Sequence, residues 1–114
     1  MERQIETLLT HIKNDYYQYT LRGRKPEEMS QVNRDMIEEF NNSLSYKEGK
    51  KYIKVIKGGS VWGFIVNADD DKQFKKGDLL KAASWNAPAR NQSRGNILDG
   101  DFSWIRWTGL EYLK

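Results

Sequence analysis

Apolar side chains recur at steps of three and four residues through the first 44 positions of the chain. The first stripe consists of Ile5, Leu8, Leu9, Ile12, Tyr16 and Tyr19, and the second of Met29, Val32, Met36, Ile37, Phe40 and Leu44. This spacing places each stripe on one face of a helix. Between the stripes, Gly23 suits the end of one helix and Pro26 suits the first turn of the next. The pattern predicts a helical hairpin, closed at Glu48 and Gly49.

After this point the chain changes to the short apolar runs that are typical of strands. The predicted strands cover residues 51–57, 60–67, 78–83 and 102–108. Gly58 and Gly59, between the first two, form a hairpin turn signal. We therefore expect an α+β fold, in which a helical hairpin is followed by a small, mainly antiparallel β-sheet.

The change of pattern divides the chain into two predicted units. Residues 1–49 form the helical hairpin, and residues 50–114 form a small β-rich ligand-binding domain. The helices pack either on the sheet or on the helices of another copy. Two amphipathic helices in so small a chain make a homo-oligomer a hypothesis, with the hairpin as the oligomerisation element.

Composition narrows the classes of function. Of the 114 residues, 38% are hydrophobic and 31% charged, which is typical of an ordered domain. No cysteine is present, so disulfides, thiolate zinc sites and a cysteine nucleophile are excluded. No apolar run approaches the roughly 18 residues of a membrane span. Residues 1–13 lack the apolar stretch of a signal peptide. We expect a cytoplasmic protein without a membrane partner.

The net charge of +3 is unevenly distributed. Residues 1–49 carry seven Lys and Arg against nine Asp and Glu, whereas residues 50–114 carry twelve against seven. The basic excess therefore belongs to the second half of the chain. It favours an anionic partner for that half, although it is weaker than the basic footprint of a dedicated DNA-binding protein.

Little in the sequence indicates catalysis. His11 is the only histidine, so a transition-metal site is not expected. The carboxylates of residues 69–71, Asp99 and Asp101 leave a hard-cation site open. There is no phosphate-binding P-loop, dinucleotide fingerprint or Gly-x-Ser-x-Gly elbow. We expect neither a cofactor nor an enzyme, with an Asp-based or Arg-based active site left open.

Binding chemistry concentrates in residues 81–96, which read KAASWNAPARNQSRGN and contain no acidic residue. The predicted ligand-binding residues, here and in the later WIRW segment, are Trp85, Arg90, Arg94, Asn96, Trp104 and Arg106. Guanidinium groups engage two phosphate oxygens at once, a tryptophan offers a stacking face, and an asparagine reads a base edge or a ribose. The alternative for each tryptophan is packing in the core.

Several motifs of the second half resemble those of a family of small tailed-phage proteins. The motifs are KGDLLKAASW at 76–85, PAR at 88–90, RGNI at 94–97 and WTG at 107–109. The resemblance covers roughly residues 50–113. This part of the chain is similar to phage Thoeris anti-defence proteins of the first type. The resemblance implies a non-catalytic homo-oligomer that sequesters cyclic ADP-ribose isomers or cyclic oligonucleotides at subunit interfaces, in the cytoplasm of an infected bacterium. It assigns no individual ligand residue.

The leading interpretation is a protein that sequesters a nucleotide-derived second messenger, with the three arginines on phosphates and Trp85 or Trp104 on the base. The main alternative is a small nucleic-acid-binding accessory protein of phage replication or transcription. An enzyme acting on nucleotides through Asp99 or Asp101 and an inhibitor that binds a host protein through residues 1–49 also remain open.

Overall fold

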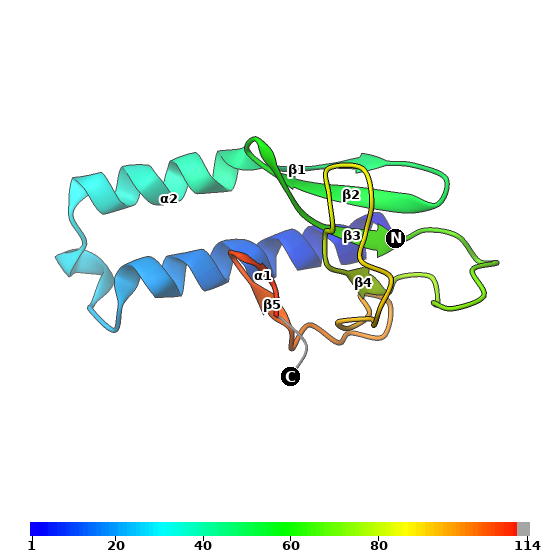
Figure 1. The fold of residues 1–114 in the computed structure, drawn as a ribbon. Coiled ribbons are helices and arrows are strands. Elements are labelled where there is room, and N and C mark those ends of the chain that lie inside the picture. Colours follow the sequence, from blue (N-terminus) through cyan, green and yellow to red (C-terminus); the bar gives the residue numbers. More distant parts are fainter. Residues whose placement is uncertain (112–114) are drawn as a thin grey trace.

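A computed structural model describes residues 1–111 (Figure 1). The helices are α1 (Glu2–Leu21), the 3-10 helix η1 (Pro26–Glu28) and α2 (Gln31–Ser43). The strands are β1 (Leu44–Glu48), β2 (Tyr52–Lys57), β3 (Ser60–Val66), β4 (Leu79–Leu80), β5 (Ile105–Arg106) and β6 (Gly109–Leu110). Strands β1 to β4 form one antiparallel sheet in chain order, and β5 and β6 form a separate hairpin. The predicted α+β class is confirmed.

The turn between the two helices differs from the prediction at one proline. Helix α1 ends as expected, with Arg22 in the left-handed region at φ 51° and its backbone N–H donating to the carbonyl oxygen of Gln18. Pro26, however, begins the 3-10 helix η1 and not α2. Helix α2 begins after Ser30, whose side-chain oxygen accepts a hydrogen bond from the backbone N–H of Asn33. The capping serine therefore sets the start of α2.

The prediction that the second helical stripe continues to Leu44 is wrong. Leu44 has extended backbone angles and begins β1, which pairs with β2 along its whole length, from Leu44 opposite Lys57 to Glu48 opposite Ile53. The glycine turn at 58–59 leaves one edge of β2 unpaired until β1 covers it. Pairing with that edge satisfies the backbone hydrogen-bonding groups of β1. Because this pairing is a long-range contact, it cannot be predicted from the helical periodicity of the sequence.

The last two predicted strands are also shorter than expected. At β4, the backbone N–H of Leu79 donates to Gly95 and the carbonyl oxygen of Leu79 accepts from Arg94, so an irregular segment pairs with its outer edge. In the run 102–108, the chain instead turns before Gly109, which has φ 140°, and forms the β5–β6 hairpin. Glycine accommodates that backbone conformation without steric cost.

The sheet is buried on both faces. One cluster joins α1 to the near face, and it contains Ile5, Leu8, Leu9, Ile12, Tyr16, Phe40, Ile53, Val55, Trp62, Ile65, Leu79, Ile97, Ile105 and Leu110. A second cluster on the far face contains Phe64, Val66, Phe74 and Leu80. Of the two arrangements left open by the sequence, the structure shows α1 packed on the sheet. Among residues 1–111 no further helix covers the far face, which lies under the loops of residues 68–94.

An extra residue in β3 helps to join the sheet to the C-terminal hairpin. Val55 pairs with Gly63 and Ile56 pairs with Val61, so Trp62 has no partner across the strands. Its side chain is buried, and its indole Nε1–H donates to the carbonyl oxygen of Arg106 at 2.8 Å. This bulge thereby aims Trp62 at the β5–β6 hairpin.

The core predicts a large difference between two leucines that carry the same side chain. Leu8 is fully buried between α1 and the sheet, whereas Leu98 is 44% exposed. Leu8→Ala should lower the free energy of unfolding by about 2–5 kcal/mol, because the cavity it leaves cannot fully collapse. Leu98→Ala should change it by less than about 1 kcal/mol. Chemical denaturation measures both, and similar losses would contradict the described packing.

Candidate functional site

Asp71 and Arg90 join the two loops that cover the far face of the sheet. Asp71 Oδ1 accepts hydrogen bonds from the backbone N–H groups of Gln73 and Phe74, at 2.8 and 2.9 Å. The same oxygen lies 2.9 Å from the Arg90 Nη2 atom. Arg90 also donates to the Tyr52 hydroxyl on β2, and its guanidinium carbon lies 4.9 Å from the Phe74 ring centroid. The pair thus fastens both loops to the sheet.

The electrostatics of this pair favour the charged carboxylate. The hydrogen bond from Arg90 lowers the pKa of Asp71 well below its usual range, and the two backbone N–H groups lower it further. The Asp71 side chain is only 3% exposed, so water does not replace these donors. Arg90 was predicted to hold phosphate, but one of its nitrogens is already committed to a carboxylate. Its side chain is nevertheless 34% exposed.

Two adjoining hollows form a basic groove beside this pair. The first, of about 510 Å³, is lined by Lys50, Lys51, Ala68, Asp70, Asp71, Lys72 and Arg90. The second, of about 300 Å³, is lined by Lys47, Glu48, Gly49, Lys51, Tyr52, Lys54, Phe64 and Asn86. Lys51 belongs to both. Six basic and three acidic side chains line the groove, an excess of three positive charges, which equals the net charge of the whole chain.

Trp85 lies beside Lys54, just outside this basic groove, and lines a separate hollow together with residues 82–84. Its side chain is 49% exposed, so the alternative that it packs in the core is wrong. The Lys54 ammonium lies 4.7 Å from the Trp85 ring centroid and donates to Asn86 Oδ1 at 3.2 Å. Lys54 pairs with Phe64 across the strands, which places Trp85 over the far face of the sheet. An exposed indole beside the Lys54 ammonium suits stacking on a flat anionic ligand.

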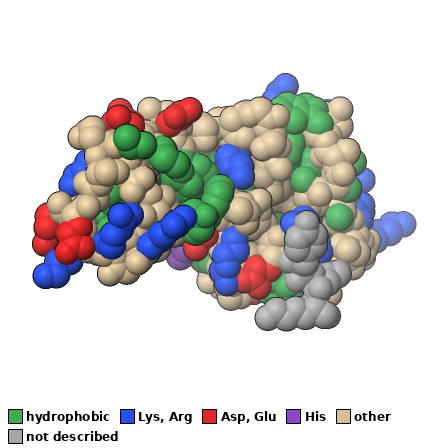
Figure 2. Space-filling model, turned by 60° about the vertical axis from the view of Figure 1, so that its left-hand side comes forward, with side chains coloured by type: hydrophobic (Ala, Val, Ile, Leu, Met, Phe, Trp, Pro, Cys, Tyr) green, Lys and Arg blue, Asp and Glu red, His purple; other side chains and the backbone are tan. Residues whose placement is uncertain are grey.

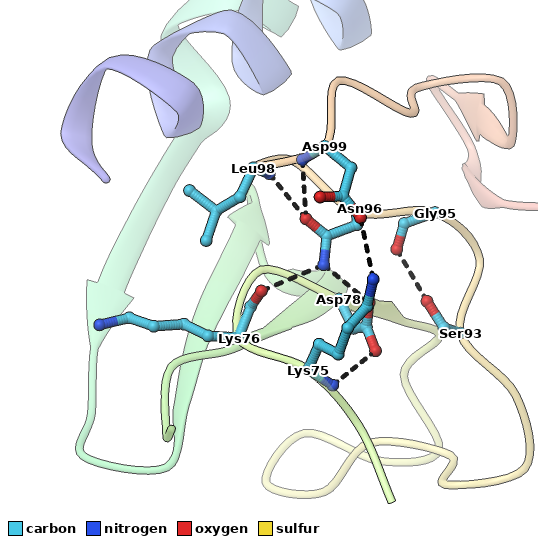
Figure 3. A network of polar contacts seen from close by, with 8 residues as sticks. All are labelled: Lys75, Lys76, Asp78, Ser93, Gly95, Asn96, Leu98 and Asp99. Atoms are coloured by element: carbon cyan, nitrogen blue, oxygen red, sulfur yellow. Dashed lines mark hydrogen bonds and ion pairs between the residues drawn. The ribbon is translucent and has the colours of Figure 1, made fainter. Parts of the chain in front are cut away.

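Asn96 is a structural residue (Figure 3). Its side chain is 5% exposed, and its amide nitrogen donates to the Lys76 carbonyl oxygen and to Asp78 Oδ1, at 3.0 and 2.8 Å. Its amide oxygen accepts from the backbone N–H groups of Leu98 and Asp99. Both donors and both lone pairs are therefore occupied. Asn96 can read a ribose or base edge only by giving up one of these bonds.

Arg94 is buried without a carboxylate. It is 2% exposed, and its Nη1 donates to Asn91 Oδ1 at 2.8 Å and to the Gln92 carbonyl oxygen at 3.0 Å. No ion pair involves it among residues 1–111, and its Nε atom has no hydrogen-bond partner. Burial lowers the pKa of its guanidinium. Arg94 is not among the side chains that line the basic groove.

Trp104 and Arg106 lie on the other side of the sheet. Trp104 packs against the cluster that contains α1, and the Arg106 guanidinium forms an ion pair with Glu111. The structure thus brings Trp85 and Arg90 to the far face, buries Arg94 and Asn96 in the loop beside β4, and places Trp104 and Arg106 in and beside the cluster on the near face. The proximity expected between the run 81–96 and the WIRW segment is not found for their tryptophans.

The sequence motifs do not identify the lysines of the basic groove. Four of them fall within residues 47–54, which read KEGKKYIK, around the turn between β1 and β2. The basic excess of residues 50–114 was the signal for three of them, Lys50, Lys51 and Lys54, whereas Lys47 belongs to the acidic first half. The predicted site instead centred on Arg90 and Arg94 in the neighbouring segment 81–96.

The carboxylates left open as a hard-cation site do not come together in the described part of the chain. Among residues 1–111, no three His, Cys, Asp or Glu side chains gather as metal ligands. The His11 ring stacks on Phe102, with centroids 4.5 Å apart. Within the same described range, no helix is long and apolar enough to cross a membrane.

The comparisons with known proteins give one family. Residues 1–110 match the profile of a family described as a family of unknown function (DUF7717). No curated protein and no solved structure matches the chain.

The Asn96 network predicts a stability defect that an exposed asparagine does not share. Asn96→Ala leaves two partly buried backbone donors and the Asp78 Oδ1 atom without their partner. The free energy of unfolding should fall by about 3 kcal/mol. Asn14→Ala, at an exposed position on α1, should change it by less than about 0.5 kcal/mol. An equal effect of the two changes in urea denaturation would show that the network contributes nothing.

The pairing of Asp71 predicts a pH dependence. Because its pKa is depressed in the folded protein, its contribution to stability is complete above the ordinary aspartate pKa of about 4 and is lost as pH falls through the lower folded value. Asp71→Asn should therefore be less stable than wild type at pH 7 and lose less stability on acidification below about pH 4.

The neighbouring Asp70 supplies the control, because it is exposed and forms no ion pair among the described residues. Asp70→Asn should keep the acid dependence of the wild type. Thermal melting from neutral to acid pH measures all three proteins. A parallel pH profile for Asp71→Asn and wild type would contradict the described pairing.

Proposed function

We propose that this chain, which belongs to the DUF7717 family, binds a small phosphate-bearing ligand with a flat ring in the basic groove. The ligand class that fits best is a nucleotide-derived second messenger, such as a cyclic ADP-ribose isomer or a cyclic oligonucleotide. The protein would hold this ligand unchanged and so remove it from signalling.

One observation carries the proposal: five lysines line the basic groove, and none of them forms an ion pair among the described residues. They are Lys47, Lys50, Lys51, Lys54 and Lys72. Like charges that line one groove repel one another, so a bound anion relieves that repulsion. Asp71 is occupied by Arg90 and does not neutralise them.

The ring component is supported by the aromatic side chains at the groove. Tyr52 lines it, with the Lys51 ammonium 5.6 Å from the Tyr52 ring centroid, and the exposed Trp85 lies beside Lys54 just outside it. Asn86 adds an amide for the polar edge of a base. Phosphate contacts from lysines combined with stacking are typical of nucleotide binding.

Sequestration is favoured over turnover because no catalytic set accompanies the groove. Its carboxylates are Glu48, Asp70 and Asp71, and Asp71 is locked in its ion pair. The resemblance of residues 50–113 to phage anti-defence proteins supports the same direction, namely capture of an immune signal in an infected bacterium. Capture requires slow release more than chemistry.

The test has two parts. Purified protein is denatured, and the released small molecules are identified by mass spectrometry. The ligand-free protein is then titrated with cyclic ADP-ribose isomers and cyclic oligonucleotides in a calorimeter. We expect one of them to bind with a stoichiometry near one per chain and to be recovered unchanged. Failure of the whole panel, or recovery of a converted product, would overturn the proposal.

Matched variants locate the site. Lys51→Gln with Lys72→Gln removes two charges from the basic groove and should weaken binding by about tenfold or more per lysine. Arg3→Gln with Lys13→Gln removes the same charge from α1 and should leave affinity unchanged. Trp85→Ala should weaken binding and abolish any quenching of tryptophan fluorescence by the ligand. Binding that instead scales with strand length and weakens steeply with salt would assign the groove to nucleic acid.

A further inference from the structure

The helical hairpin carries an apolar surface that the rest of the chain does not cover. Val32 is 67% exposed, Tyr19 51% and Met36 45%. Figure 2 shows hydrophobic side chains in a continuous band across the helical end of the molecule. Beside Tyr19 and Met36 lies a hollow of about 300 Å³, lined also by Arg22 and Arg24. We call this surface the hairpin band.

The hairpin band is the unburied part of the second apolar stripe. Of the stripe on and before α2, Met29 and Phe40 are buried, and Phe40 stacks on Tyr16 with ring centroids 4.1 Å apart. Val32 and Met36 lie on the same face of α2, four residues apart, yet point into solvent. Exposed apolar side chains of this size in one continuous patch mark an interaction surface.

Opposite charges border the hairpin band on its two sides. On the α1 side, Arg22 lies with its guanidinium carbon 5.3 Å from the Tyr19 ring centroid, and Arg24 lines the hollow. On α2, Asp35, Glu38 and Glu39 are exposed, and no ion pair involves them among residues 1–111. In Figure 2, acidic side chains lie above the band and basic side chains lie below it, and side chains of both signs occur farther to the left and right on this face.

We propose that a second copy of this chain covers the hairpin band. A two-fold axis along the band brings the acidic border of each copy against the basic border of the other and buries Val32, Met36 and Tyr19 of both. A two-fold axis across the band would instead place like charges together. One chain therefore contains both halves of a self-complementary interface, as a symmetric dimer requires.

In this geometry the axis runs along Val32 and Met36, which face their own counterparts, whereas Tyr19 faces the other side of the partner's band. The two hairpins run in the same direction, with their tips at the same end. The inference is independent of the ligand proposed for the basic groove, because that groove lies over the far face of the sheet and shares no lining residue with the hairpin band.

Cysteine cross-linking tests the dimer and its direction, because the chain contains no cysteine. Met36→Cys and Val32→Cys are each oxidised, and the products are separated on non-reducing gels. Both variants should form disulfide-linked dimers, since each site faces itself. Leu98→Cys, an equally exposed apolar position away from the hairpin, should remain monomeric under the same oxidation. Cross-linking of none of the variants, or of Leu98→Cys to the same extent, would overturn the proposal.

Sedimentation measures the unmodified protein. Wild type should sediment as a dimer, and Met36→Glu, which introduces charge at an exposed position, should sediment as a folded monomer with unchanged circular dichroism. High salt should weaken the wild-type dimer, because the charged borders contribute to it. A wild-type monomer at every concentration, or a dimer that Met36→Glu leaves intact, would contradict the assignment.

Discussion

The central strand β3 has no polar face, and this constraint shapes the rest of the molecule. All five residues from Trp62 to Val66 are buried, so both sides of the sheet must be covered. Helix α1 covers one side with its apolar stripe. The other side is covered by loops, which lack the internal hydrogen bonds of a helix. Such loops need side chains to satisfy and hold their backbone.

That need accounts for many of the polar residues in the irregular segment. Asp71 and Arg90 tie the two covering loops to each other and to Tyr52. Asn96 and Asp78 hold the segment that pairs with β4. Arg90 and Asn96, which the sequence predicted as ligand contacts, thus hold the loops that cover the far face of the sheet. These loops in turn form one wall of the basic groove, whose charge comes from lysines on the sheet edge and its turns.

The helices, the α+β class and the first β-hairpin could be predicted because local periodicity and turn glycines determine them. Strand β1 could not, because Leu44 continues a helical pattern and only the free edge of β2 decides its conformation. For the site, Trp85 was predicted as a ligand residue and is exposed as that role requires, whereas Asn96 was predicted for the same role and has a saturated amide. Which polar side chains bond to the chain itself depends on long-range contacts.

The central claim is that Arg90 fastens the covering loops, whereas Lys51 in the basic groove has no part in holding them. Amide hydrogen exchange of Arg90→Gln and Lys51→Gln in the ligand-free protein tests it most directly. Arg90→Gln should speed exchange in residues 71–78 and 89–96 and leave the β2–β3 pairing protected. Lys51→Gln should match wild type throughout. Unchanged exchange in Arg90→Gln, or equal effects of the two variants, would contradict the account.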